Sequence, residues 1–65
     1  MFQNCTETEL IVLRDALKEY ALSMRMRDGR IVKTEKEFLQ SASPAFVKQY
    51  LSALGMAKEA ELRIR

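Results

Sequence analysis

Hydrophobic side chains recur every three or four residues through the first third of the chain, at Leu10, Leu13, Leu17, Tyr20 (or Ala21) and Met24. This spacing places them on one face of a helix, while charged residues between them fill the opposite side. The pattern predicts a long amphipathic helix over about residues 7–27.

Local signals mark both ends of this helix. Thr6 and Glu9 have the spacing of a capping box, in which each side chain bonds the backbone amide of the other residue. Asp28-Gly29 is expected to end the helix, because glycine adopts the left-handed conformation without steric cost. Ile11 and Leu22 lie beside the main stripe, so the apolar face is wider than a helix in a small monomer usually needs.

Residues 30–33 contain the β-branched pair Ile31 and Val32. Such residues favour strands, but a single short strand would have no second strand to pair with. We therefore expect an extended loop that places Ile31 or Val32 in the core.

Two further helix starts follow. Thr34 and Glu37 form a second capping box, which predicts a short helix over about 35–42. Ser43 fits a helix N-cap and Pro44 the first helical position after it. Because proline disfavours helical geometry in the preceding residue, the second and third helices should be separate.

The end of the third helix has two interpretations. Gly55 fits a left-handed cap, which would end the helix at about residue 54. The hydrophobic spacing nevertheless continues past the glycine toward residue 64, and a glycine inside a helix costs only about 1 kcal/mol relative to alanine. The sequence leaves both alternatives open.

Together these elements predict one small all-α domain over residues 1–65, a three-helix bundle or helical hairpin with the first and third helices antiparallel. A chain of 65 residues buries only about 60% of its unfolded surface, so its core is small. The side chains expected to form that core are Leu13, Leu17, Tyr20, Phe38, Phe46, Tyr50 and Leu51.

The composition argues against enzymatic chemistry. The chain has no histidine, one cysteine and two glycines, so it lacks the common general base, a zinc ligand set and a glycine-rich phosphate loop. Glu7 and Glu9 oppose activation of the single thiol, Cys5, which we interpret as incidental. We expect no catalytic residues, no metal and no cofactor.

The apolar excess indicates a protein-interaction or regulatory module. Exposed apolar surface beyond what a bundle can cover marks an interface, and a symmetric dimer is the commonest way to bury one. The partner would be a second copy of the chain or a larger protein. The predicted interface residues are Ile11, Leu22, Met26, Met56, Leu62 and Ile64.

The alternative is a DNA-binding regulator, because residues 34–55 have the outline of a helix-turn-helix with 44–54 as the recognition helix. The residues that would contact bases or phosphates are Arg25, Arg27, Arg30, Lys33, Lys48, Gln49 and Ser52. Two observations oppose this hypothesis. Residues 44–54 carry one charge, Lys48, whereas DNA interfaces are markedly basic, and the turn is short and lacks the usual glycine.

The sequence gives weaker indications of where in the cell the protein is located. The net charge of +2 does not by itself indicate an anionic membrane, and the early apolar run is too short for a signal peptide or a membrane span. The single cysteine fits a reducing compartment. We expect a cytoplasmic protein with no membrane partner.

Overall fold

The structure is a computed structural model that describes residues 2–64, and three helices and one β-hairpin make up its regular elements over that range. This confirms the predicted small all-α fold. The elements in chain order are α1 (Glu7–Ser23), β1 (Met26–Arg27), β2 (Arg30–Ile31), α2 (Glu35–Ser41) and α3 (Pro44–Leu62).

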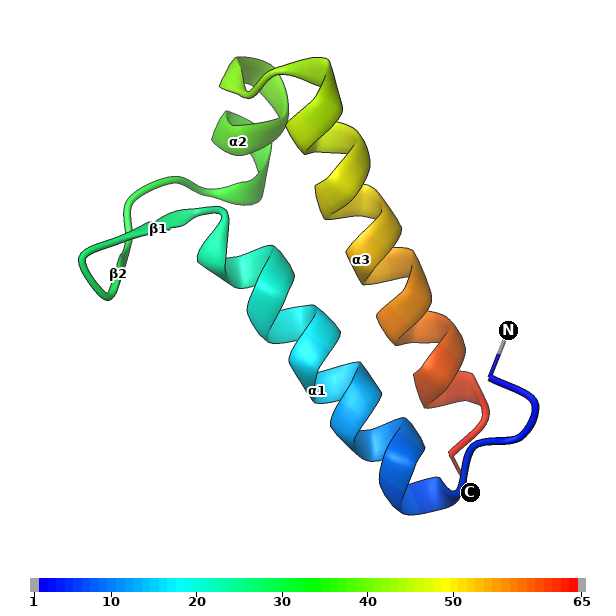
Figure 1. Cartoon of the computed structure of the whole chain (residues 1–65). Coiled ribbons are helices and arrows are strands. Elements are labelled where there is room, and N and C mark those ends of the chain that lie inside the picture. The colour runs from blue at the N-terminus through cyan, green and yellow to red at the C-terminus, as the bar shows by residue number, and fades with distance from the viewer. Residues whose placement is uncertain (1, 65) are drawn as a thin grey trace.

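The two long helices lie side by side in a single layer (Figure 1). They are antiparallel, with Leu10 near the start of α1 packed close to Ala60 near the end of α3. The short α2 packs at one end of the pair, and the β-hairpin projects from the same end (Figure 1). The Cα atoms span 36 × 24 × 14 Å, so the molecule is about one helix layer thick.

All three predicted helix starts are confirmed. The backbone N–H of Glu9 donates to Thr6 Oγ1 at 3.1 Å, and the N–H of Thr6 donates to Glu9 Oε1 at 2.8 Å. Thr34 and Glu37 form the same reciprocal pair at the start of α2. Ser43 caps α3, with Pro44 in the first turn.

Because each cap uses an ionised glutamate, we expect the folded protein to lose stability in acid. The backbone N–H of Thr6 lowers the pKa of Glu9 below its ordinary 4.5, and the N–H of Thr34 lowers the pKa of Glu37 in the same way. A carboxyl whose pKa is lower in the folded state stabilises the fold above its unfolded pKa, and that contribution disappears as the pH falls through the folded pKa. We expect the urea midpoint to fall as the pH drops below about 4.5. A Glu9→Gln, Glu37→Gln double variant keeps the caps but should lose part of this dependence; an unchanged pH profile would contradict this.

The end of α1 differs from the prediction. The helix ends at Ser23, and the Asp28-Gly29 pair forms the turn of a hairpin that pairs Met26 with Ile31. Both turn residues have positive φ, 53° and 77°, which is the geometry that Asp-Gly favours in two-residue hairpins. We expected residues 30–33 to lack a strand to pair with, and this was wrong. The partner strand is β1, whose residues 26–27 had been predicted to form the end of the first helix. Ile31 and Val32 are more than half exposed and not in the core.

The third helix continues through Gly55 without a break and ends at Leu62, which settles the two alternatives. Apart from its chain neighbours and the backbone of its own helix turns, no atom lies within 4 Å of the place where a Cβ on Gly55 would project. We therefore expect Gly55→Ala to raise the free energy of unfolding by about 1 kcal/mol, because alanine loses less backbone entropy in a helix. Urea denaturation measures this change, and a destabilised variant would show that the position is not an open helical site.

Two clusters of buried side chains form the core, with residues from the long helices, from α2 and from the segment before α1. Ala21, Phe38, Tyr50 and Ala53 make the first, and Phe2, Leu10 and Ala60 the second. The rings of Phe38 and Tyr50 meet at 4.9 Å between centroids. The alanines let α1 and α3 approach closely.

The predicted core is correct for some residues and wrong for others. Phe38 and Tyr50 are buried, and Leu13 and Leu17 are half-buried. Tyr20, Phe46 and Leu51 are 49%, 55% and 50% exposed, which overturns their assignment to the core. Phe46 lies in the first turn of α3, which extends past the end of α1 (Figure 1).

Candidate interaction surface

Large apolar side chains are unusually exposed. Within residues 2–64, Tyr50 is the one large side chain that is fully buried. The large hydrophobic residues left exposed are Ile11, Val12, Tyr20, Ile31, Val32, Phe46, Leu51 and Leu62. Eight large apolar side chains within residues 2–64 therefore keep substantial contact with water.

A shallow apolar groove of about 310 Å³ runs between the two long helices. Leu17 and Tyr20 contribute from α1, and Ala53 and Met56 from α3. The polar rim consists of Lys48, Gln49 and Ser52. We call this side of the α1–α3 layer the groove face.

Hydrogen bonding at the groove is sparse. The Tyr20 hydroxyl donates to Gln49 Oε1 at 3.3 Å, which joins the two helices across the rim. This bond is long and exposed to water, so it adds little to stability. Tyr20 therefore presents its ring to solvent while its hydroxyl has a partner.

Charged side chains cross the layer on its other side. Arg14 Nη1 and Lys18 Nζ lie 4.0 Å and 3.8 Å from the carboxylate oxygens of Glu61. Exposed pairs of this kind contribute little to stability, but they keep their surroundings hydrated. With 100° of rotation per residue, Arg14 and Lys18 lie on the flank of α1 turned away from Tyr20.

The structure distributes the predicted interface residues over several places. Met56 lines the groove, whereas Ile64 packs against the cluster of Phe2, Leu10 and Ala60. Leu62 is 77% exposed near the end of α3. The remaining three predicted residues also lie apart from the groove. Ile11 and Leu22 are on the charged side of α1, and Met26 is in the hairpin.

The groove residues were only partly identified from the sequence. Leu17 and Tyr20 were assigned to the core and Gln49 and Ser52 to DNA contacts, although all four line one groove. The signal that could have found the groove is the run of alanines at 53, 57 and 60, because small residues on one helix leave space beside the seam.

A part-buried polar network joins α3 to α2 and to the segment that follows α1. The Tyr50 hydroxyl donates to Glu35 Oε2 at 2.8 Å and accepts from Arg25 Nη1 at 3.4 Å. Arg25 Nε also donates to the backbone carbonyl of Lys33 at 3.1 Å. Burial, and then the bond to the Glu35 carboxylate, raises the pKa of Tyr50 above its ordinary 10.0. Tyr50 therefore stays a neutral donor, and its contribution is lost only in strong alkali.

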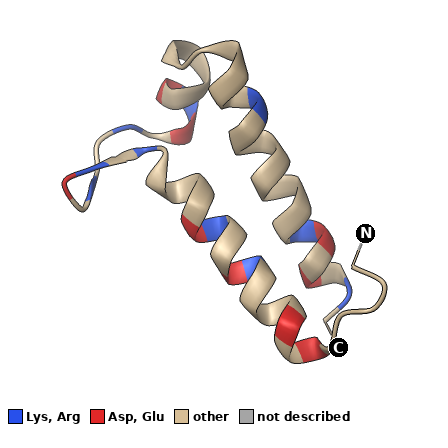
Figure 2. Ribbon diagram, viewed as in Figure 1, with Lys and Arg blue, Asp and Glu red and all other residues tan. Residues whose placement is uncertain are grey.

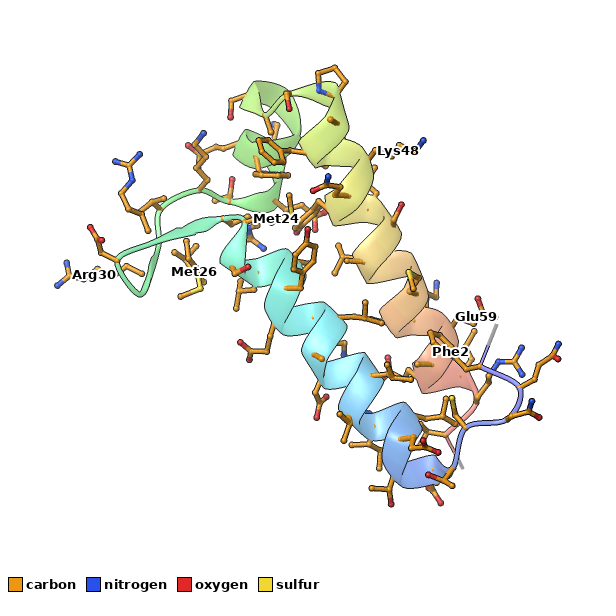
Figure 3. The ribbon with its side chains drawn as sticks, in the orientation of Figure 1. Phe2, Met24, Met26, Arg30, Lys48 and Glu59 are labelled. Atoms are coloured by element: carbon orange, nitrogen blue, oxygen red, sulfur yellow. The ribbon has the colours of Figure 1, made fainter. Side chains whose placement is uncertain are left out.

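The residues predicted to bind DNA do not share one surface. Arg25 is engaged in the Tyr50 network, and Lys33 Nζ donates to Ser41 Oγ at 3.1 Å. Arg27 and Arg30 face each other across the hairpin, with Arg30 at its outer end (Figure 3). The other three, Lys48, Gln49 and Ser52, border the groove beside α1.

Metal ligands and membrane-spanning helices are two further features to consider within residues 2–64. From Phe2 to Ile64, the structure brings together no cluster of three cysteine, aspartate or glutamate side chains that could hold a metal. No helix in the same range has the length and apolar character needed to cross a membrane. Cys5 is half-buried beside a small hollow that Phe2, Glu7 and Arg63 also line.

Comparison of the chain with protein-family models, with curated protein sequences and with solved structures finds no match.

Proposed function

We propose that the protein is a small non-enzymatic interaction module that associates with a second copy of itself. Two observations support this proposal: α1 and α3 pack in a single layer, and eight large hydrophobic side chains within residues 2–64 are exposed. A stable domain ordinarily packs at least two layers around its core, so a second layer is missing from the isolated chain. A reducing, cytoplasmic location belongs to the same proposal, on the lone cysteine.

The surface area supports the same proposal. The chain exposes 5010 Å², whereas a globular monomer of its mass, 7.5 kDa, exposes about 4,200 Å². The excess, about 800 Å², equals what one partner buries in a protein–protein interface of standard size. Self-association would bring the exposed area per chain back to the ordinary value.

The DNA-binding alternative has less support. A recognition helix must present its contact residues to the major groove, but Gln49 and Ser52 border α1. Arg25, one of the residues predicted to contact phosphates, donates its hydrogen bonds within the protein. Binding to duplex DNA at low salt that weakens steeply as salt rises would restore this alternative.

Thermal unfolding followed by circular dichroism tests the proposal. Because association stabilises only the folded chain, the midpoint should rise by several degrees between about 5 and about 500 μM protein. A midpoint that does not change over this range would contradict self-association.

A further inference from the structure

We infer that the groove face is the surface through which two copies dock, so that two α1–α3 layers stack into an arrangement of four long helices. This inference rests on the proposed function and adds the face and the symmetry. In a two-fold dimer each copy offers the same patch, so Leu17, Tyr20, Ala53 and Met56 of one copy would meet the same residues of the other.

The shape of the chain favours a second copy as the occupant. The smallest Cα extent is 14 Å, close to the thickness of one layer of helices. A second identical layer completes the two-layer arrangement and covers the groove in both copies at once. The excess surface, about 800 Å² per chain, is what a standard dimer interface removes from each partner.

Charge distinguishes the groove face from the opposite side of the layer. Between Lys48 and Lys58, α3 has no charged residue, as the uncoloured length of the helix in Figure 2 shows. The opposite side carries Arg14, Lys18 and Glu61 across the seam. Docking there would remove water from three charges. Among the residues that line the groove Lys48 alone is charged, and Figure 3 shows it pointing away from the helix pair, while the Arg63–Glu59 ion pair lies beyond the groove toward the end of α3.

The surface shape of the groove face is suited to packing against other helices. Ala53 and Ser52 are small and form a depression, while Tyr20 and Met56 stand beside it on the two helices. Side chains of one helix pair can then fit into the depression of the other, as ridges into grooves. Tyrosine and methionine are enriched at protein interfaces, because tyrosine is a rigid amphipathic side chain and methionine adapts to irregular surfaces.

Two matched substitutions test the face. Tyr20 and Leu51 are 49% and 50% exposed, but Tyr20 lines the groove and Leu51 does not. Sedimentation equilibrium of the full chain should show that Tyr20→Glu raises the dimer dissociation constant on the order of 100-fold, because each interface would bury two carboxylates near one another. Leu51→Glu should change the constant by no more than about threefold, because an exposed substitution away from an interface has little effect.

A second variant keeps the test decisive if Tyr20→Glu fails to fold. Ser52 is exposed at the groove rim and belongs to neither core cluster, so Ser52→Glu should keep the helical circular dichroism spectrum and weaken the dimer at least about tenfold. If Leu51→Glu disrupts the dimer and the folded groove variants do not, the face is wrong while self-association stands. If the unmodified chain is monomeric, the face and the proposed function both fail.

Discussion

Replacement of Tyr50 by alanine is expected to remove a large part of the chain's stability. Tyr50 is 1% exposed, its ring packs on Phe38, and its hydroxyl joins Glu35 of α2 to Arg25. Removing a buried aromatic side chain costs about 3–5 kcal/mol. A chain of this length has a total stability of roughly 3–10 kcal/mol, so the loss takes between about a third and all of it.

Two companion variants separate the causes of this effect. Tyr50→Phe keeps the ring but leaves the Glu35 carboxylate and the Arg25 guanidinium without the hydroxyl, so it should cost about 1–2 kcal/mol. Leu51→Ala changes the next residue, which is half exposed, and should cost less than about 1 kcal/mol. Urea denaturation followed by circular dichroism measures all three, and a Tyr50→Ala variant as stable as Leu51→Ala would refute the assigned core.

Enlarging an alanine in the seam between α1 and α3 should have the second largest effect. Ala57 is 1% exposed, one turn from both Ala53 and Ala60, which belong to the two core clusters. A leucine there must push the two helices apart or adopt an unfavourable rotamer, which costs about 1–3 kcal/mol. We therefore expect Ala57→Leu to lower the thermal midpoint by roughly 5–20 °C.

The neighbouring position supplies the control for this prediction. Lys58 is exposed, so Lys58→Leu adds the same side chain to α3 without entering the seam. Its free energy of unfolding should stay within about 0.5 kcal/mol of the unmodified chain. A tolerated Ala57→Leu would mean that α1 and α3 are not packed closely through the alanines.

Local signals predicted the helices well because the caps act over four residues. Thr6, Thr34 and Ser43 begin α1, α2 and α3, as their spacing predicted. Asp28-Gly29 was misread because the same pair can follow a helix or turn a hairpin. The choice depends on whether residues 26–27 find a strand to pair with, and their partner lies only three residues beyond them.

The core and the groove depend on information that spacing along one helix does not contain. The sequence predicts which residues share a face of α3, but the rotation of that face relative to α1 is set by the alanines packing against Ala21 and Leu10. That rotation turns Leu51 outward and opens the groove beside Tyr20. The apolar excess was predictable, whereas its division between the two sides of the layer was not.

The molecular mass in solution tests the central claim most directly. Light scattering coupled to size-exclusion chromatography, with the chain loaded from about 10 μM to about 1 mM, should give a mass approaching twice 7.5 kDa as concentration rises. Dissociation toward 7.5 kDa on dilution would show that the association is reversible. A mass of 7.5 kDa at every concentration would contradict the proposal that the chain associates with a second copy of itself.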